Sequence, residues 1–405
     1  FVGRRTRRPQ PVRYCAANVA VDCIARGLIL SATLVLVAAS PNEIPARAKI
    51  PTVIPPVPNQ NPSENAEKWR DFVAASPHGD VLQLLEWGAV KKPEWTPIPV
   101  ALESAGAYDA TCLVFKKALP GGRSYFYLSR GPILDWSNEK LVRSMFARLV
   151  EIAKAHRAVW IRTDPCVLDC RDDVKSLLQN IGFAPAPDSG SIFGGLQPRC
   201  NMVLDMGAPI EEVFEKKFDA KWRYNTRLAA KKGVSVWSDG GRDDLQIFHD
   251  IYRVTSERNG FTGYSLAYFQ KMWDALAPAG VMKLVVTYHE KQALSAAIAF
   301  KLPPHAWYMF GASSNEKRNL MPNHLMQWTM MQWAKEHGCQ SYDFRGVPDP
   351  TRGEVPAHEI GLVKFKTGFG AQMVRYIGEW DLVLRPIEYK LWNSVRPKIA
   401  GALRR

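Results

Sequence analysis

The chain has 405 residues, of which 46% are apolar, 11% aromatic and 23% charged, and its formal net charge is +14. The composition excludes a wholly disordered protein, and the length predicts two domains rather than one core. The positive charge favours polyanionic partners, such as nucleic acid, phosphorylated metabolites or an anionic membrane face, without choosing among them.

The first 62 residues differ from the rest. An Arg-rich start leads into "RGLILSATLVLVAAS", which resembles a signal peptide, although its apolar run of roughly 14 residues is short for a membrane span. The Pro-rich stretch "AKIPTVIPPVPNQNPSEN" then predicts an extended linker. We expect residues 1–62 to be a disordered or mis-started extension outside the fold, the chain being a fragment or a reading frame begun upstream of the true start.

The cysteines indicate the compartment. There are seven, an odd number without CxxC spacing, which predicts reduced thiols and a cytoplasmic location. Cys166 and Cys170 are four apart, but no second Cys/His pair has ligand spacing, so we predict no metal site.

Helical and strand-like periods alternate from Trp69 onward, which predicts an α/β fold. Residues 66–79 predict a helix, and residues 111–132 a hairpin around a Leu-Pro-Gly-Gly turn. A helix at 138–156 and a buried strand at 158–165 follow. The same order recurs as strands at 282–302 and 305–314, a helix at 323–337 and a strand at 339–350.

Identical residues recur at an offset of 181 within these equivalent elements, which indicates a duplicated domain. The pairs are Tyr127 and Tyr308, Ala153 and Ala334, Lys154 and Lys335, and His156 and His337. Each unit has the pattern of an acetyltransferase-like (GNAT-type) domain. We therefore predict an α/β (α+β) fold of two tandem domains with mixed sheets flanked by helices: 63–204 completed by 379–405, and 205–378.

The segments that begin the two equivalent helices lack a coenzyme A loop. Coenzyme A acetyltransferases hold the pyrophosphate on a Gly-rich loop that begins a helix. Here the two positions carry "DWSNEKL" and "KRNLMPNHL", neither of which contains glycine. A different acyl donor is expected.

Residues 210–232, "IEEVFEKKFDAKWRYNTRLAAKK", predict one helix that ends at Gly233. An apolar stripe on one face accompanies a basic stripe of Lys216, Arg223, Arg227 and Lys231 on another. The basic stripe either lies along a phosphate backbone or is a solvated face beside a packed one.

Two further segments carry candidate site residues. The helix predicted at 243–261 places Arg258 near its C-terminus, as a dipole partner or a functional group. In "GLVKFKTGFG", alternation predicts a strand with Val363 and Phe365 on one face and Lys364 and Lys366 on the other, toward a cleft. No HExxH, Walker or Gly-x-Ser-x-Gly motif occurs.

Several segments, in order, resemble one family. They are "SPHGDVLQLLEWGAVKK", "KWRYNTRLAAKKGVSVW", "TSERNGF", "WYMFGASSN", "HLMQWTMMQWAKEHGCQSYDFRGVPDP" and "GLVKFKTGFGAQMVRYIGEWD". Together, from about residue 63 onward, they look like the Fem (FemABX) family of peptidoglycan bridge-forming aminoacyltransferases. Because Gly233 leads directly into "VSVW", the chain is similar to compact members without a coiled-coil arm.

The resemblance implies transfer of an amino acid from aminoacyl-tRNA to the stem-peptide amine of a peptidoglycan precursor, either lipid II or UDP-MurNAc-pentapeptide. It implies no coenzyme A or other cofactor. We expect the protein to be a monomer. A coenzyme A- or carrier-dependent N-acyltransferase and a basic nucleic-acid-binding protein remain the alternatives. The C-terminal segment 385–405 predicts either an amphipathic helix on the inner membrane face or a helix packed on the first domain.

The resemblance also assigns roles. Phe365 and Lys366 match the family's Phe-Lys pair, whose lysine stabilises charge on the reacting ester, and Lys364 is placed with the substrate-binding residues. Lys91 or Lys92, together with Arg258, is implied to contact the precursor's phosphates, and Tyr308 to line the substrate. Apart from the resemblance, the sequence places no His or carboxylate as an obvious general base, and Asp343 and Glu359 are the candidates.

Overall fold

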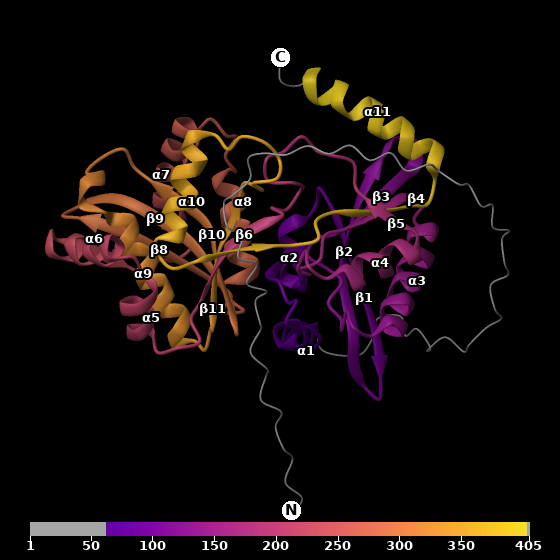
Figure 1. The fold of residues 1–405 in the computed structure, drawn as a ribbon, viewed down its shortest axis with the longest axis horizontal. Coiled ribbons are helices and arrows are strands. Elements are labelled where there is room, and N and C mark those ends of the chain that lie inside the picture. The colour runs from indigo at the N-terminus through magenta and orange to yellow at the C-terminus, as the bar shows by residue number, and fades with distance from the viewer. Residues whose placement is uncertain (1–61, 403–405) are drawn as a thin grey trace, which may run out of the picture. The chain divides into compact units, whose positions relative to one another are not determined.

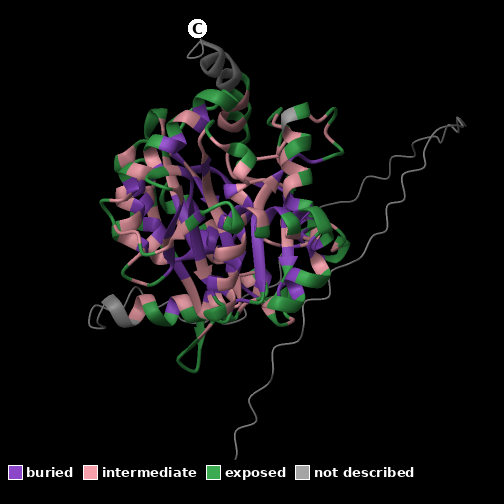
Figure 2. Cartoon of the chain, turned by 90° about the vertical axis from the view of Figure 1, so that its left-hand side faces the viewer, coloured by how far each residue is buried: buried purple, intermediate pink, exposed green. Residues whose placement is uncertain are grey.

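The computed structural model describes residues 62–402, so the extension expected at the N-terminus lies outside the described residues. Within this range the chain folds into two lobes, each built on a mixed sheet (Figure 1). Buried residues gather in the strands and on the helix sides that face them, and exposed residues lie on the outer helices (Figure 2). No helix in the described range is long and apolar enough to cross a bilayer.

The first lobe contains six strands. They are β1 Thr96–Ser104, β2 Ala107–Leu119, β3 Arg123–Leu128, β4 Ala158–Thr163, β5 Phe183–Pro185 and β13 Trp380–Val383, accompanied by helices α1 Pro62–Ala75, α2 Leu85–Lys91, α3 Glu139–Ala155, α4 Asp172–Ile181 and α11 Pro386–Ala402. The sheet order is β1-β2-β3-β4-β13-β5. The Asn138 side chain caps α3 by accepting a hydrogen bond from the Leu141 N–H at 3.1 Å.

The second lobe contains seven strands. They are β6 Cys200–Asp205, β7 Val234–Trp237, β8 Met282–His289, β9 Gln292–Leu302, β10 His305–Ser313, β11 Ser341–Val347 and β12 Gln372–Arg375, with helices α5 Ile210–Lys217, α6 Ala220–Lys231, α7 Leu245–Asn259, α8 Leu266–Leu276, α9 Pro322–Glu336 and α10 Ala357–Thr367. The order is β12-β6-β11-β10-β9-β8-β7.

The two sheets are equivalent. Strands β3 and β10 each pair antiparallel with the preceding strand and parallel with the strand that follows a helix, β4 or β11. Tyr127 and Tyr308, 181 residues apart, lie on β3 and β10. Helix α3 connects β3 to β4, and α9 connects β10 to β11. The prediction of two tandem acetyltransferase-like units with mixed sheets is confirmed.

The lobes exchange one strand each. Strand β6 follows the first lobe in the chain but lies between β11 and β12 of the second sheet, whereas β13 lies between β4 and β5 of the first. The boundary expected at residue 204 therefore assigned β6 to the wrong lobe. Arg162 of β4 fastens β13 through a buried ion pair with Asp381, with Nη2 and Oδ2 2.7 Å apart.

One apolar core spans both lobes. Trp69 and Trp87 of the first lobe belong to the same buried cluster as Phe248 and Phe300 of the second. The rings of Trp87 and Phe300 meet edge to face with centroids 6.2 Å apart. This shared core fixes the lobes around the cavity described below.

Two predicted elements are wrong. The strand expected around Val363–Lys366 is helix α10, which begins after Pro356 and ends at Gly368; four alternating residues fit one turn of helix as well as a strand. The single helix expected at 210–232 is broken at Phe218, whose ψ of 140° is extended, and Asp219 begins α6.

Candidate active site

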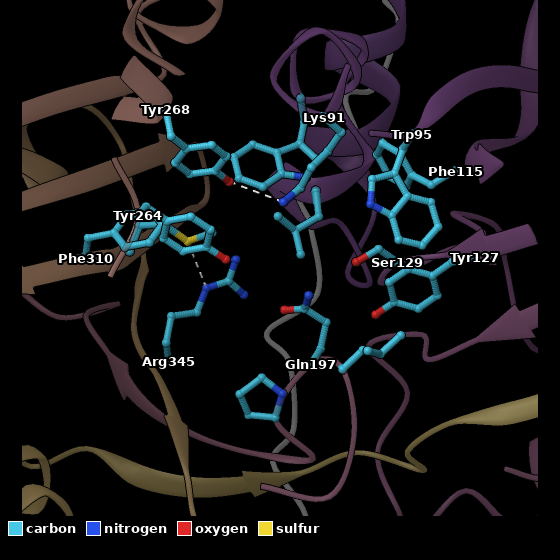
Figure 3. Close-up of a pocket in the computed structure, with 15 residues that line it drawn as sticks. Lys91, Trp95, Phe115, Tyr127, Ser129, Gln197, Tyr264, Tyr268, Phe310 and Arg345 are labelled. Carbon is cyan, nitrogen blue, oxygen red and sulfur yellow. Dashed lines mark hydrogen bonds between the residues drawn. The ribbon is translucent and has the colours of Figure 1, made fainter. Parts of the chain in front are cut away.

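A cavity of about 390 Å³ lies where the lobes meet (Figure 3). Both lobes contribute to its wall, which is rich in aromatic rings. The first lobe contributes Leu82, Trp87, Lys91, Trp95, Phe115, Tyr127, Ser129 and Leu196–Pro198, and the second contributes Tyr264, Tyr268, Met309, Phe310 and Arg345. Such a wall of rings with a few polar groups is typical of a site for an organic ligand.

Lys91 brings one cation to this wall from the end of α2. Its Nζ donates a hydrogen bond to the Tyr268 hydroxyl at 3.2 Å and lies 5.0 Å from the centre of the Trp87 ring. Burial lowers its pKa. Among the described residues no carboxylate lies within ion-pair distance of Lys91, so its charge is available to an anionic ligand. Lys92, the alternative from the sequence, is exposed at the end of the helix and does not line the cavity.

Arg345 of β11 brings a second cation from the other lobe. Its Nη1 lies 3.0 Å from Oδ2 of Asp80, and its guanidinium lies 5.8 Å from the centre of the Trp307 ring. Figure 3 shows Arg345 and Lys91 pointing into the same space. Sequence reasoning missed Arg345 because no local pattern distinguishes it within "YDFRGV".

A carboxyl group lies just behind the cavity wall. The Tyr127 hydroxyl donates a hydrogen bond to Asp164 Oδ2 at 2.7 Å, and the Arg130 N–H donates to Oδ1 at 2.7 Å. Burial raises the pKa of Asp164 to about 7, against the opposing effect of the Arg130 charge. A group with this pKa can exchange a proton near neutral pH. Its position directly after a buried strand, in "WIRTDP", was the available signal for it.

Lys366 contacts the cavity wall from behind rather than lining the cavity. Its side chain is buried, and Nζ donates to the main-chain oxygens of Arg345 at 3.1 Å and Gly346 at 2.7 Å. Burial lowers its pKa to about 8, opposed by the negative charges of Asp343 and Glu359. The ammonium is therefore held in place next to the residue that supplies the second cation.

Phe365 anchors α10 in the second lobe. Its main-chain oxygen accepts a hydrogen bond from Trp222 Nε1 at 3.0 Å, and its ring meets the buried His324 at 5.4 Å. Lys364, on the same helix, is exposed.

The other predicted substrate-binding residues also lie away from the cavity. Tyr308 packs into the core of the second lobe, where burial raises its pKa to about 12. Arg258 donates to the main-chain oxygen of Ser313 at 2.9 Å and to Oδ1 of Asn315 at 2.7 Å, at the end of β10. The structure thus brings Lys91 alone of these predicted residues to the cavity.

The predicted basic stripe is less one-sided than the sequence indicated. Lys216 pairs with Glu212 at 2.9 Å, and Arg227 and Arg223 both contact Glu215. Within the described residues no ion pair engages Lys231. A phosphate backbone on this face would have to compete with these two glutamates.

The sequence predicted no metal site from the spacing of its Cys and His residues, and the structure adds the arrangement of the side chains in space. No group of three or more His, Cys, Asp or Glu side chains in the part of the chain that the structure describes is arranged to hold a metal ion.

Two acetyltransferase-like lobes with exchanged strands around an aromatic, cationic cavity define a two-lobed transferase fold. A model of the FemAB family matches residues 65–287 and 279–396, and the chain belongs to this family. In the second lobe, α6 leads into β7 through Lys232 and Gly233 alone.

The chain is similar to proteins of known name. It is 29% identical to the lipid II:glycine glycyltransferase of Staphylococcus aureus (strain MRSA252) over 402 residues, covering 82% of this chain and 94% of that protein. The lipid II:glycine glycyltransferase of Staphylococcus saprophyticus is 29% identical with the same coverage. The crystal structure of FemX matches with a TM-score of 0.73 and 26% identity, over 80% of this chain and 98% of that one.

Proposed function

We propose that this chain is an aminoacyltransferase that moves an amino acid from aminoacyl-tRNA to the stem-peptide amine of a peptidoglycan precursor, either lipid II or UDP-MurNAc-pentapeptide. One observation carries this proposal: a member of the FemAB family, similar to lipid II:glycine glycyltransferases, holds two cations and a proton-accepting pair at one aromatic cavity.

The cavity suits an acceptor that is both anionic and ring-bearing. Lys91 and Arg345 supply positive charge from opposite lobes, where the diphosphate of the precursor would bind. The aromatic rings of the wall offer flat surfaces for a sugar or a base. Because Lys91 is held by a hydroxyl and two rings rather than by a carboxylate, a phosphate need not displace an ion pair to bind it.

The reaction requires an ester, an amine and a path for one proton. The neutral amine forms a bond to the ester carbonyl carbon, the ester C–O bond breaks, and the ribose hydroxyl leaves with a proton. Since the donor is already activated, positioning and electrostatics supply most of the catalysis.

Tyr127 and Asp164 form the proton path. As the amine attacks, its proton passes to the Tyr127 oxygen while the Tyr127 proton passes to Asp164 along their 2.7 Å hydrogen bond. The return of that proton to the ribose oxygen balances the reaction. We assign the role of general base to this pair rather than to Asp343, because the Asp343 carboxylate already accepts hydrogen bonds from the Asn201 side chain and from the Arg345 main chain.

Lys366 stabilises the negative charge that develops on the ester oxygen. Two of its N–H groups are committed to the main-chain oxygens of Arg345 and Gly346, so its charge is fixed behind the cavity wall and acts on the ester oxygen through its electrostatic field rather than by direct contact. Replacing Lys366 by Met should lower the rate about 100-fold to 1000-fold, by analogy with the loss of an oxyanion-hole donor. Acceptor binding, measured by calorimetry, should weaken far less than the rate falls, because Asp80 still holds the Arg345 guanidinium.

The donor distinguishes this proposal from the alternative. Purified protein is incubated with UDP-MurNAc-pentapeptide or lipid II, with charged tRNA in one arm and acyl-coenzyme A in the other, and the acceptor mass is followed. A mass gain of one or more amino acids with charged tRNA supports the proposal. Acylation from the thioester with no gain from any proteinogenic aminoacyl-tRNA would replace it with a coenzyme A-dependent N-acyltransferase.

A further inference from the structure

Helix α11 carries an exposed apolar stripe. Ile387 is 82% exposed and Leu391 is 64% exposed, the highest values among the large apolar residues that the structure describes. Residues four apart lie on the same side of a helix, so these two form one face. The same spacing continues in the sequence at Val395 and Ile399.

The opposite side of α11 is packed against the first lobe, which fixes the direction of the stripe. The Tyr389 hydroxyl donates to Asp381 Oδ2 at 2.6 Å, and the Tyr389 ring lies 5.6 Å from that of Trp160. Glu388 accepts a hydrogen bond from Arg123 at 3.2 Å. Ile387 and Leu391 therefore face outward, because other residues of the helix contact the first lobe and these two are exposed.

Positive charge accompanies the stripe. Residues 385–405 contain six Lys or Arg residues and one acidic residue, Glu388. That carboxylate is occupied by Arg123 and lies 3.6 Å from Arg385. Lys390 is exposed between Ile387 and Leu391, and no ion pair engages it within the described residues. The face is thus apolar and cationic together.

We propose that α11 is a docking surface for an anionic phospholipid bilayer. A bilayer surface offers both negative headgroups for Lys390 and an apolar layer for Ile387 and Leu391. Nucleic acid would satisfy the charge alone. A second copy of this chain, at a net charge of +14, would be repelled. Because the helix has 17 residues and none in the described range can cross a bilayer, α11 lies along the membrane surface.

Docking at a bilayer would also favour one acceptor, the lipid-linked precursor, over the UDP-linked one; this extension rests on the proposed function. A protein held at the bilayer meets precursors whose diphosphate is linked to a lipid at the same surface. We therefore infer that the lipid-linked precursor is the preferred acceptor over the water-soluble UDP-linked one.

Vesicle binding tests the surface without any enzymatic assay. The whole chain is sedimented with vesicles of phosphatidylcholine containing 30% phosphatidylglycerol, with pure phosphatidylcholine vesicles, and with the anionic vesicles in about 0.5 M salt, where charges are screened within about 4 Å. We expect binding to the anionic vesicles that weakens about tenfold or more in the other two conditions.

Substitutions locate the binding face. The double variant Ile387→Asp/Leu391→Asp should bind anionic vesicles at least about tenfold more weakly, and Lys390→Glu about tenfold more weakly. Tyr224→Asp is the matched control, because Tyr224 is 62% exposed on α6, and its vesicle affinity should equal that of the unsubstituted chain. Far-ultraviolet circular dichroism verifies that each variant is folded.

Three results would overturn the docking proposal: no vesicle binding by the unsubstituted chain, equal binding by the double variant, or a double variant that alters tRNA affinity or sedimentation mass instead.

Enzyme kinetics tests the inference about the acceptor separately from the docking proposal. The double variant should raise the KM for vesicle-embedded lipid II about tenfold and leave turnover of UDP-MurNAc-pentapeptide unchanged. Equal effects on both acceptors would refute the acceptor inference, whereas no turnover of either by the unsubstituted chain would refute the proposed function and leave vesicle binding intact.

Discussion

Arg345 and Asp80, 265 residues apart, form an ion pair that joins the two lobes at the wall of the cavity, with Nη1 and Oδ2 3.0 Å apart. The backbone of Arg345 is equally constrained. Its φ of 61° is left-handed, its N–H donates to Asp343 at 2.6 Å and its oxygen accepts from Lys366 at 3.1 Å. A residue other than glycine keeps a left-handed backbone conformation only where surrounding contacts impose it, and residues of this kind cluster at functional sites.

Asp80→Asn should therefore weaken both stability and acceptor binding. The substitution keeps the oxygen that accepts the Leu82 N–H at 2.9 Å but removes the charge that balances a largely buried Arg345. We expect the free energy of unfolding in urea to fall by about 2–3 kcal/mol. The KM for the acceptor should rise about tenfold if the released guanidinium no longer points into the cavity.

The control for Asp80→Asn is an exposed pair. Glu139 and Arg143 lie 2.8 Å apart on α3 with side chains 64% and 45% exposed, so Glu139→Gln should change the unfolding free energy by no more than about 0.5 kcal/mol. Equal effects of the two substitutions would mean that the Asp80–Arg345 pair does not hold the lobes.

The sequence predicted the parts of this fold that depend on local patterns. The hairpin at 111–132 has a turn that forces the chain to reverse, and the helix ending near His156 has a continuous apolar face. The 181-residue offset related Tyr127 to Tyr308 because duplication preserves spacing. Each of these signals lies within a few residues or recurs at a fixed interval.

The remaining features depend on contacts between distant segments. Strand β6 has the same apolar pattern whichever sheet receives it, so its place in the second sheet could not be predicted from residues 200–205. Phe365 and Lys366 alternate with their neighbours as in a strand, and only the packing of α10 against Trp222 distinguishes a helix. Arg345 becomes a site residue only when Asp80 and the first lobe are beside it.

Gly368, the residue that caps the C-terminus of α10, lies against the Trp222 side chain of α6. A Cβ added there would overlap the Trp222 indole, although the φ of −65° itself suits any residue. We expect Gly368→Ala to lower the unfolding free energy by about 1–3 kcal/mol through this overlap and to lower the transfer rate by displacing Lys366. Gly361→Ala, on the same helix, meets nothing within 4 Å and should leave stability unchanged or raise it by up to about 1 kcal/mol. A Gly368→Ala protein as stable as the Gly361→Ala protein would contradict the packing.

The pH dependence of transfer should follow Asp164 and Lys366. Asp164 must be ionised to accept a proton, so kcat/KM rises with pH up to its pKa of about 7. Lys366 must be protonated to stabilise the oxyanion, so kcat/KM falls above its pKa of about 8. The expected profile has a narrow maximum between these two values, measured with UDP-MurNAc-pentapeptide from pH 5.5 to 9.5.

The Tyr127→Phe variant tests whether the acidic limb of that pH profile reports the ionisation of Asp164. The Tyr127 hydrogen bond lowers the pKa of Asp164, so its loss should raise that pKa and move the limb to higher pH. Asp164→Asn should abolish the limb. If the limb stays in place in both variants, it belongs to the substrate amine rather than to Asp164.

Lys91→Ala and Lys92→Ala separate the two lysines between which the sequence could not choose. Lys91 lines the cavity and contacts Tyr268 and Trp87, whereas Lys92 is exposed outside it. A hydrogen bond to a charged phosphate contributes about 1.5–3 kcal/mol, so Lys91→Ala should raise the acceptor KM about 10-fold to 100-fold with little effect on kcat. Lys92→Ala should change it less than about twofold, since an exposed charge outside the cavity is screened by solvent. The opposite ranking would place the phosphates on the outer surface of α2 and remove the cavity from the acceptor site.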